Sequence, residues 1–165
     1  EFRRVLFRSF FRRCGELLRP GGMLAMQAIT IADQHYAQAL RRVDFIKRYV
    51  FPGSFIPSVT ALVDAATAAS DLRLLHLEDF GLHYAETLRR WRLRMIENAH
   101  LILAAGYPES LLRTWEWYLA YCEGGFAEGY LGVAQLVFAR PGAAVSVPAE
   151  LPQVAAAPYA PLQTA

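Results

Sequence analysis

The stretch FFRRCGELLRPGGMLAMQAITI, residues 10–31, decides the fold class of this chain. Its first part, residues 10–19, has the apolar spacing of a helix with one buried side. Residues 20–22, Pro-Gly-Gly, end that helix, because proline cannot continue it and glycine permits the turn. Met23–Ile31 is almost entirely apolar with β-branched residues at its end, which is typical of a strand buried on both faces, as in a parallel sheet. Helix, turn and buried strand in this order predict an α/β unit.

Outward from this unit, helical and strand patterns continue to alternate. Residues 51–58, FPGSFIPS, form a loop built from proline and glycine, and Ser58 has the side chain of a helix N-cap. Residues 84–104 carry apolar side chains on one helical face and charges on the other. The predicted helices cover 33–48, 58–69, 84–104 and 108–121, and the predicted strands cover 72–80 and 131–139.

Composition excludes several classes of protein. The chain has 165 residues, of which 55% are hydrophobic and 19% charged, so it is neither a disordered chain nor a densely basic nucleic-acid module. Cys14 and Cys122 have no CxxC spacing, which argues against a zinc site or a disulfide framework and favours a reducing, cytoplasmic setting. The longest uncharged stretch of the body, residues 49–63, is interrupted by Pro52 and Pro57, so no transmembrane segment is predicted.

The two ends differ from the body. Residues 1–9, EFRRVLFRS, look like the translation of a sequencing-adapter oligonucleotide, and their three arginines against Glu1 account for the whole net charge of +2. The alternative is a genuine basic, amphipathic N-terminus such as a targeting segment. Residues 141–165 hold five of the nine prolines and are predicted to be a disordered tail. We therefore expect the body, residues 10–140, to be the C-terminal part of a longer domain.

Motifs beyond this pattern carry a family resemblance. The chain resembles the cyclopropane-fatty-acyl-phospholipid synthase family, which includes the mycolic acid cyclopropane synthases. It departs from the family at Ser54, where a second glycine is usual. The matching segments are FFRRCGELLRPGGML at 10–24, DFIKRYVFPGSFIPSV at 44–59, EDFGLHYAETLRRW at 78–91, WYLAYCEGGF at 117–126 and GVAQLVFAR at 132–140.

The resemblance implies the C-terminal part of a Rossmann-like, S-adenosylmethionine-dependent methyltransferase, with about three strands and inserted helices. Such enzymes methylate the cis double bond of an acyl chain, and the resulting carbocation loses a proton and closes to a cyclopropane, with bicarbonate as the base. The implied partners are phospholipid acyl chains at a membrane surface, reached by a cytoplasmic enzyme peripheral to the inner membrane face. Simple methylation without ring closure is a related outcome.

The resemblance also implies what this chain lacks. The family's cofactor loop, bicarbonate-holding glutamate and active-site cysteine lie N-terminal to the helix at residue 10, so we expect the chain alone to be inactive. The competing hypothesis is a non-catalytic helical cap that binds a lipid or a protein partner.

Four residues fall on positions where the family places its chemistry. The resemblance puts Tyr84 on a tyrosine that donates to bicarbonate, and Gln27 where many members have a histidine on the same anion. His83 is the histidine of interest because the mycolic branch often has histidine there. The structural alternatives are a packed tyrosine, a buried glutamine bonded to backbone, and a helix-capping histidine. Cys122 falls on a family cysteine, although a buried, unreactive thiol is the simpler interpretation.

The resemblance also predicts the border of an acyl channel. Its candidates are the loop residues Phe51, Pro52, Gly53 and Phe55, together with Trp117 and Tyr118 on the last long helix. Aromatic residues at this helical spacing are equally typical of an ordinary core, and the sequence leaves both interpretations open.

Overall fold

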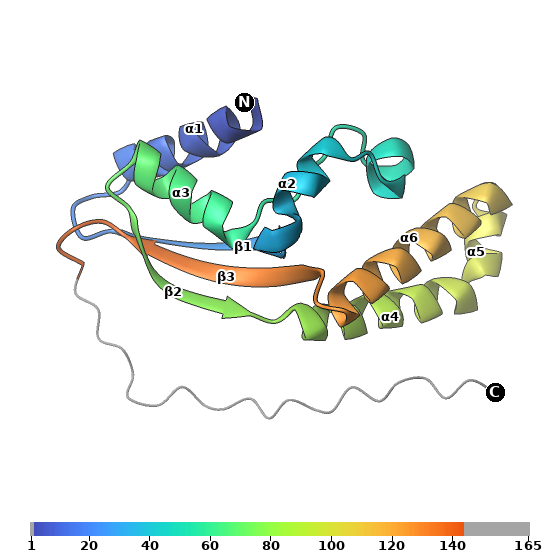
Figure 1. Cartoon of the computed structure of the whole chain (residues 1–165). Helices are drawn as coiled ribbons and strands as arrows, with labels where there is room; N and C mark the ends of the chain where they lie inside the picture. The colour runs from blue at the N-terminus through green and yellow to red at the C-terminus, as the bar shows by residue number, and fades with distance from the viewer. Residues whose placement is uncertain (1, 144–165) are drawn as a thin grey trace.

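The computed structural model describes residues 2–143, with side chains from Val5 onward. It contains a three-stranded sheet with helices packed against it (Figure 1). The tail predicted over 141–165 lies, from residue 144 on, outside the described residues. The elements are α1 (Phe2–Leu17), β1 (Met23–Ile31), α2 (Asp33–Arg41), the π-helix η1 (Ile46–Val50), α3 (Val59–Ala69), β2 (Arg73–Asp79), α4 (Gly81–Glu97), α5 (Ala99–Ala104), α6 (Glu109–Ala127) and β3 (Leu131–Ala139).

The sheet has the order β1-β3-β2, and both hydrogen-bonded pairs are antiparallel. The prediction that β1 is buried on both faces of a parallel sheet is therefore wrong. The two helix–strand units do give β1 and β2 the same direction, but β3 lies between them and runs the opposite way. Side chains of β1 alternate between partly buried and exposed up to Ile29. A uniformly apolar strand gives no signal of which face is covered, because periodicity is the signal.

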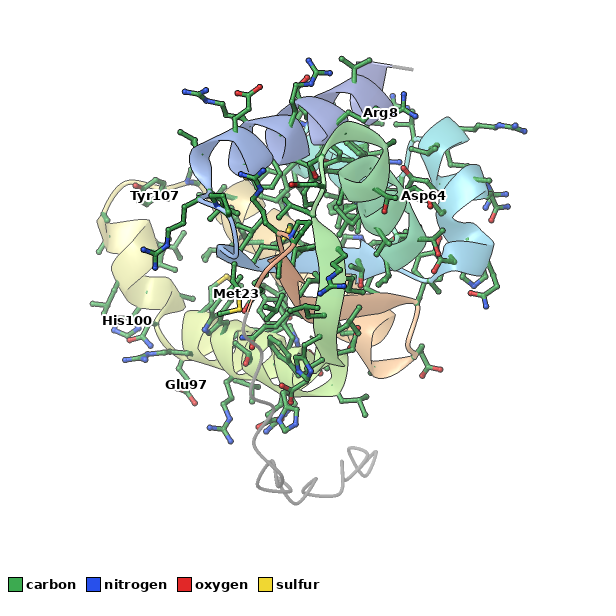
Figure 2. The ribbon with its side chains drawn as sticks, turned by 90° about the vertical axis from the view of Figure 1, so that its left-hand side faces the viewer. Arg8, Met23, Asp64, Glu97, His100 and Tyr107 are labelled. Carbon is green, nitrogen blue, oxygen red and sulfur yellow. The ribbon has the colours of Figure 1, made fainter. Side chains whose placement is uncertain are left out.

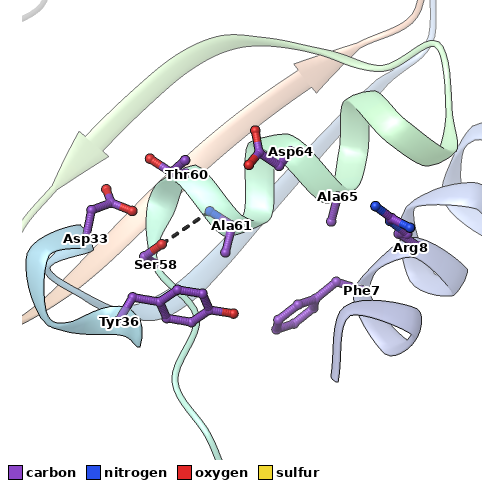
Figure 3. Close-up of a pocket in the computed structure, with 9 residues that line it drawn as sticks. All are labelled: Phe7, Arg8, Asp33, Tyr36, Ser58, Thr60, Ala61, Asp64 and Ala65. Atoms are coloured by element: carbon purple, nitrogen blue, oxygen red, sulfur yellow. Dashed lines mark hydrogen bonds between the residues drawn. The ribbon is translucent and has the colours of Figure 1, made fainter. Parts of the chain in front are cut away.

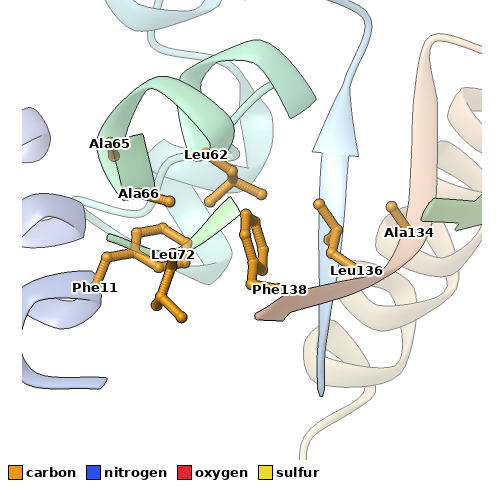
Figure 4. Packing of buried hydrophobic residues seen from close by; sticks show 8 residues of the cluster. All are labelled: Phe11, Leu62, Ala65, Ala66, Leu72, Ala134, Leu136 and Phe138. Carbon is orange, nitrogen blue, oxygen red and sulfur yellow. The ribbon is translucent and has the colours of Figure 1, made fainter. Parts of the chain in front are cut away.

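One face of the sheet packs against α1 and α3. Phe11 from α1, Leu62 from α3 and Phe138 from β3 are fully buried, and the two phenylalanine rings lie 5.2 Å apart (Figure 4). As predicted, Ser58 caps α3, since its Oγ accepts a hydrogen bond from the Ala61 amide at 3.2 Å. Arg140, just past β3, closes this end of the molecule by donating to both carboxylate oxygens of Asp71 at 3.0 Å.

A helical arm of α4, α5 and α6 projects from the other end of the sheet (Figure 1). Figure 2 shows Glu97, His100 and Tyr107 at the outer end of this arm. The single helix predicted over 84–104 is wrong, because the chain breaks at Asn98. The Asn98 side chain donates to the Arg94 carbonyl at 2.7 Å, which occupies an acceptor at the helix end. Ala85 and Leu88 of α4 pack with Leu119 and Phe126 of α6 in a second hydrophobic cluster.

Three other predicted helices also differ in length. The helix predicted over 108–121 continues to Ala127, because Gly124 and Gly125 stay helical instead of forming the turn to the next strand. The helix predicted over 10–19 begins at Phe2, because residues 2–9 contain no proline or glycine that would stop it. The helix predicted over 33–48 ends at Arg41, and the chain then forms the short π-helix η1. Within residues 2–143, no helix is long and apolar enough to cross a membrane.

Candidate functional site

The structure brings together residues of the loop after η1, of α4 and of α6. The ring of Tyr84, in the first turn of α4, lies 5.0 Å from that of Phe126 on α6. Tyr118 and Cys122 are one helical turn apart on α6 and share a hydrogen bond. Phe51 reaches across from the loop, with its ring 5.9 Å from that of Tyr118. We name these five residues the tyrosine–cysteine cluster.

The cluster runs from a buried interior to the surface, since Cys122 and Phe126 are buried, Tyr84 and Tyr118 are half-buried and Phe51 is exposed. Burial raises the pKa of the Cys122 thiol to about 11, although the hydrogen bond from Tyr118 partly opposes this shift. Burial likewise raises the pKa of Tyr118 to about 12. Both groups therefore stay protonated at neutral pH. In this environment Cys122 has the properties of an apolar group with a weak donor, and the Tyr118 hydroxyl already donates to it, whereas the Tyr84 hydroxyl belongs to a side chain that can donate to a ligand.

Gln27 lies elsewhere, in the middle of β1. Its side-chain oxygen accepts a hydrogen bond from Gln135 Nε2 at 3.4 Å, and both side chains are exposed. Glu78 on β2 is opposite Gln135 in the strand register, so the three polar side chains form a row across the sheet. Tyr84 belongs to the tyrosine–cysteine cluster whereas Gln27 lies beside Gln135, so a shared role for them stays a prediction.

His83 lies on the exposed side of α4. Its amide donates to the Phe80 carbonyl at 3.0 Å, and its own carbonyl accepts from the Thr87 hydroxyl at 3.1 Å. These backbone contacts belong to the helix itself, and the imidazole is exposed outside the tyrosine–cysteine cluster. Its catalytic role stays a prediction.

The candidate channel residues separate into different surroundings. Phe51 joins the tyrosine–cysteine cluster, whereas the Phe55 ring packs 5.2 Å from Phe7 of α1. Pro52 and Gly53 form the exposed turn between them, and Gly53 has φ +81°, a conformation that favours glycine. Trp117 is exposed, and its ring lies 6.3 Å from that of Phe45.

One largely buried ion pair between α4 and α6, next to the cluster, was not predicted from the sequence. Arg92 of α4 donates to Glu123 of α6 at 3.1 Å, and the two side chains are only 19% and 10% exposed. Glu123 directly follows Cys122 on the packed side of α6, so a charge in an otherwise apolar face was visible in the sequence. Its partner Arg92 could not be identified from the sequence, because no helical or strand period pairs residues 31 positions apart.

A separate cavity of about 420 Å³ lies between α1, α2 and α3. None of the predicted site residues lines it. Figure 3 shows the Tyr36 ring pointing across it toward Phe7, with Asp33 and Asp64 on its rim. The tyrosine–cysteine cluster is therefore distinct from this cavity.

The glycine pair at residues 21 and 22 forms the turn between α1 and β1. Gly142 fills the space beside it, since its carbonyl oxygen lies 2.9 Å from where a Gly21 Cβ would stand. The backbone of residue 142 therefore packs closely against this turn. Within residues 2–143, no group of three or more metal-ligating side chains is present.

Comparison with known proteins places these features in a family. Residues 2–136 match the family described as mycolic acid cyclopropane synthetase. The chain is 38% identical over 133 residues to the tuberculostearic acid methyltransferase UfaA1 of Mycobacterium tuberculosis, covering 81% of this chain and 31% of that protein. It is 32% identical over 125 residues to a probable fatty acid methyltransferase of Pseudomonas putida, covering 75% of this chain and 31% of that protein.

Solved structures agree at the level of the fold. The cyclopropane synthase MmaA2 of M. tuberculosis aligns with a TM-score of 0.71 at 24% identity, covering 83% of this chain and 50% of that one. The mycolic acid cyclopropane synthase CmaA1, complexed with SAH and CTAB, also aligns with a TM-score of 0.71. These neighbours confirm a Rossmann-like methyltransferase fold. The chain spans less than a third of these curated relatives and about half of these solved structures. With the family match over residues 2–136, the chain belongs to the mycolic acid cyclopropane synthetase family.

Proposed function

We propose that this chain is the C-terminal part of an S-adenosylmethionine-dependent methyltransferase that modifies the acyl chains of lipids. The observation that carries the proposal is the 38% identity with a tuberculostearic acid methyltransferase over 133 residues. Other relatives are named as a probable fatty acid methyltransferase, a sphingolipid C9-methyltransferase and a cyclopropane mycolic acid synthase, so we take an acyl chain as the shared substrate class. We further propose cis double bonds of phospholipids as the target, reached by a cytoplasmic enzyme peripheral to the inner membrane face.

The tyrosine–cysteine cluster supports this chemistry. Ring faces of Phe51, Tyr118 and Phe126 can each stabilise a cation by about 0.5–2 kcal/mol, and the buried part of the cluster, at Cys122 and Phe126, is shielded from water that would quench it. We propose that the Tyr84 hydroxyl donates to bicarbonate, the base of the reaction, and that Gln27 is a second donor. Of the two residues, Tyr84 has the better surroundings for this role, because Gln27 is exposed and bonded to Gln135.

The chain spans about 31% of the length of the two curated methyltransferases that it matches, so we expect the chain alone to transfer no methyl group. The same short span favours the second candidate function, a non-catalytic cap whose helical arm binds a lipid or a protein. The two functions differ in whether this segment supports turnover once joined to a complete methyltransferase.

A chimera tests the proposal. Residues 10–140 replace the matching segment of the M. tuberculosis tuberculostearic acid methyltransferase, and labelled S-adenosylmethionine is supplied with detergent-dispersed oleoyl phospholipid. We expect label in the acyl chain, with NMR separating cyclopropane from branched products. Tyr84→Phe should lower the rate roughly 100-fold, because the anion that acts as the base loses a positioned hydrogen-bond donor. Tyr107→Phe, at an exposed tyrosine on the arm, should leave the rate unchanged.

Two outcomes would contradict the proposal. A chimera that is folded and binds S-adenosylmethionine but transfers no label supports the cap function. Micromolar binding of S-adenosylmethionine to the chain alone, measured by calorimetry, would refute its expected inactivity.

A further inference from the structure

The segment between α2 and η1 concentrates positive charge. Residues 41–49, RRVDFIKRY, contain four basic residues and one acidic residue, a net charge of +3, whereas the whole chain carries +2. The Lys47 ammonium group donates to the carbonyl oxygens of Ala39 and Arg42, which folds η1 back onto the end of α2. Arg41, Arg42 and Arg48 remain exposed. Their charges therefore lie close together on one compact segment.

Large apolar side chains are exposed beside these arginines. Val43 is 74% exposed, Tyr49 63% and Trp117 of α6 58%. Phe45 holds the segment against α6, with its ring 5.5 Å from Tyr49, 6.3 Å from Trp117 and 6.4 Å from Tyr121. The segment from α2 to η1 and the helix α6 thus contribute to one surface (Figure 1). The basic–aromatic surface, as we name it, consists of Arg41, Arg42, Arg48, Tyr49, Trp117 and Tyr121.

We infer that the basic–aromatic surface docks the protein on an anionic phospholipid bilayer. Tryptophan and tyrosine favour the boundary between headgroups and acyl chains, because their rings are apolar and their N–H and O–H groups are polar. Clustered arginines are attracted to the negative surface potential of acidic lipids. The exposed Val43 side chain lies within the same segment and can insert between headgroups. A nucleic acid would use the charges but would leave such an exposed aliphatic side chain without a favourable environment.

The location of this surface connects it with the tyrosine–cysteine cluster. Only Val50 separates Tyr49 from Phe51, whose ring contacts Tyr118 of the cluster. Docking through Tyr49 and Trp117 would therefore bring the Phe51 side of the cluster to the lipid surface. This consequence rests on the proposed function, whereas the docking itself does not.

Vesicle flotation of the full chain tests the inference. Vesicles of phosphatidylcholine with added phosphatidylglycerol should bind the chain, vesicles of phosphatidylcholine alone should bind it much more weakly, and salt should weaken the difference. The triple variant Arg41→Gln, Arg42→Gln, Arg48→Gln should lose about 100-fold in apparent affinity, because each basic residue at an anionic surface contributes roughly a factor of five. Tyr49→Ala with Trp117→Ala should also weaken binding, and most clearly at high salt.

The matched control removes three exposed arginines elsewhere, as Arg12→Gln, Arg19→Gln, Arg94→Gln, and should keep the affinity within about threefold. Equal loss in the control variant, or equal binding to both kinds of vesicle, would overturn the inference. Preferential binding to DNA over anionic vesicles would overturn it in favour of a nucleic-acid surface. Circular dichroism of each variant confirms that the fold is kept. Since flotation involves no methyl transfer and the chimera is assayed on dispersed lipid, the two proposals fail independently.

Discussion

At the scale of single residues, Cys122 gains its properties from its surroundings. A thiol with a pKa of about 11 is ionised to only about one part in ten thousand at neutral pH, and the thiolate is the reactive form. In a Cys14→Ser background, we therefore expect very slow alkylation by iodoacetamide at neutral pH, with a rate that rises as the pH approaches 11. Tyr118→Phe should slow it further, because the hydrogen bond that lowers the thiol pKa is lost. Rapid alkylation at neutral pH, measured by mass spectrometry, would show that Cys122 is accessible and activated.

Glu86 titrates far from its ordinary range. Hydrogen bonds from Arg89 and then Arg90 lower its pKa from 4.5 to about 2. A depressed carboxyl pKa stabilises the fold above the unfolded-state value, and the contribution is lost as the pH falls from 4.5 toward 2. NMR titration of the carboxyl group should give the low value, and Arg89→Gln with Arg90→Gln should return it toward 4.5. The expectation fails if Glu86→Gln leaves the acid unfolding curve between these pH values unchanged.

The sequence identified some, but not all, of the side chains that lie together in the candidate site. The resemblance selected Tyr84, Tyr118, Cys122 and Phe51, and these four do meet in the tyrosine–cysteine cluster. It could not reveal that Phe55, four residues after Phe51, turns the other way toward Phe7, since a Gly53 turn redirects the chain. Nor could it pair Gln27 with Gln135, because strand register depends on contacts between distant segments.

At the scale of elements, the Arg92–Glu123 pair fastens α4 to α6. Glu123→Ala leaves a largely buried arginine without its partner, and should lower the free energy of unfolding by about 2 kcal/mol, below the range for fully buried pairs because some exposure remains. Arg92→Leu combined with Glu123→Leu should recover most of this loss, since it removes both charges. Urea denaturation measures both effects.

An exposed ion pair provides the control. Arg13 and Glu16 on α1 are 3.0 Å apart but well exposed, so Glu16→Ala should cost less than about 0.5 kcal/mol. If Glu123→Ala were no more costly than Glu16→Ala, the buried pair would not hold the arm together.

The predicted boundaries of helices and strands agree with the structure where a local signal, such as a helix cap, marks the boundary. The strand predicted over 131–139 matches β3, and the Ser58 cap places the start of α3 correctly. The break at Asn98 was not predicted because the apolar spacing continues through it, whereas the structure has a side-chain hydrogen bond from Asn98 to the Arg94 carbonyl at this point. Element spacing also left the position of β3 between β1 and β2 open, since sheet order is set by packing of distant segments.

At the scale of the whole molecule, β1 forms an edge of the described sheet. Among residues 2–143 it has one strand partner, β3, and its sequence carries no charge. Such edges favour pairing with other chains. We expect the chain to self-associate, and Ile29→Lys, at an exposed position of β1, to weaken association roughly tenfold.

Light scattering coupled to size-exclusion chromatography, over a range of protein concentrations, measures this association. Leu101→Lys introduces the same charge on the exposed surface of α5 and should leave it unchanged. A monodisperse wild-type monomer that unfolds cooperatively would contradict the expectation.

The pairing of β1 with β3 also has a consequence during biosynthesis. Gln27 and Gln135 are hydrogen-bonded neighbours in the sheet but 108 positions apart in the sequence. At ribosomal rates of about 5–20 residues per second, β1 waits roughly 5–20 s for its strand partner to be made. During that interval an uncharged apolar strand has no β3 to pair with, so a nascent chain stalled before residue 131 is the form that should depend most on chaperones.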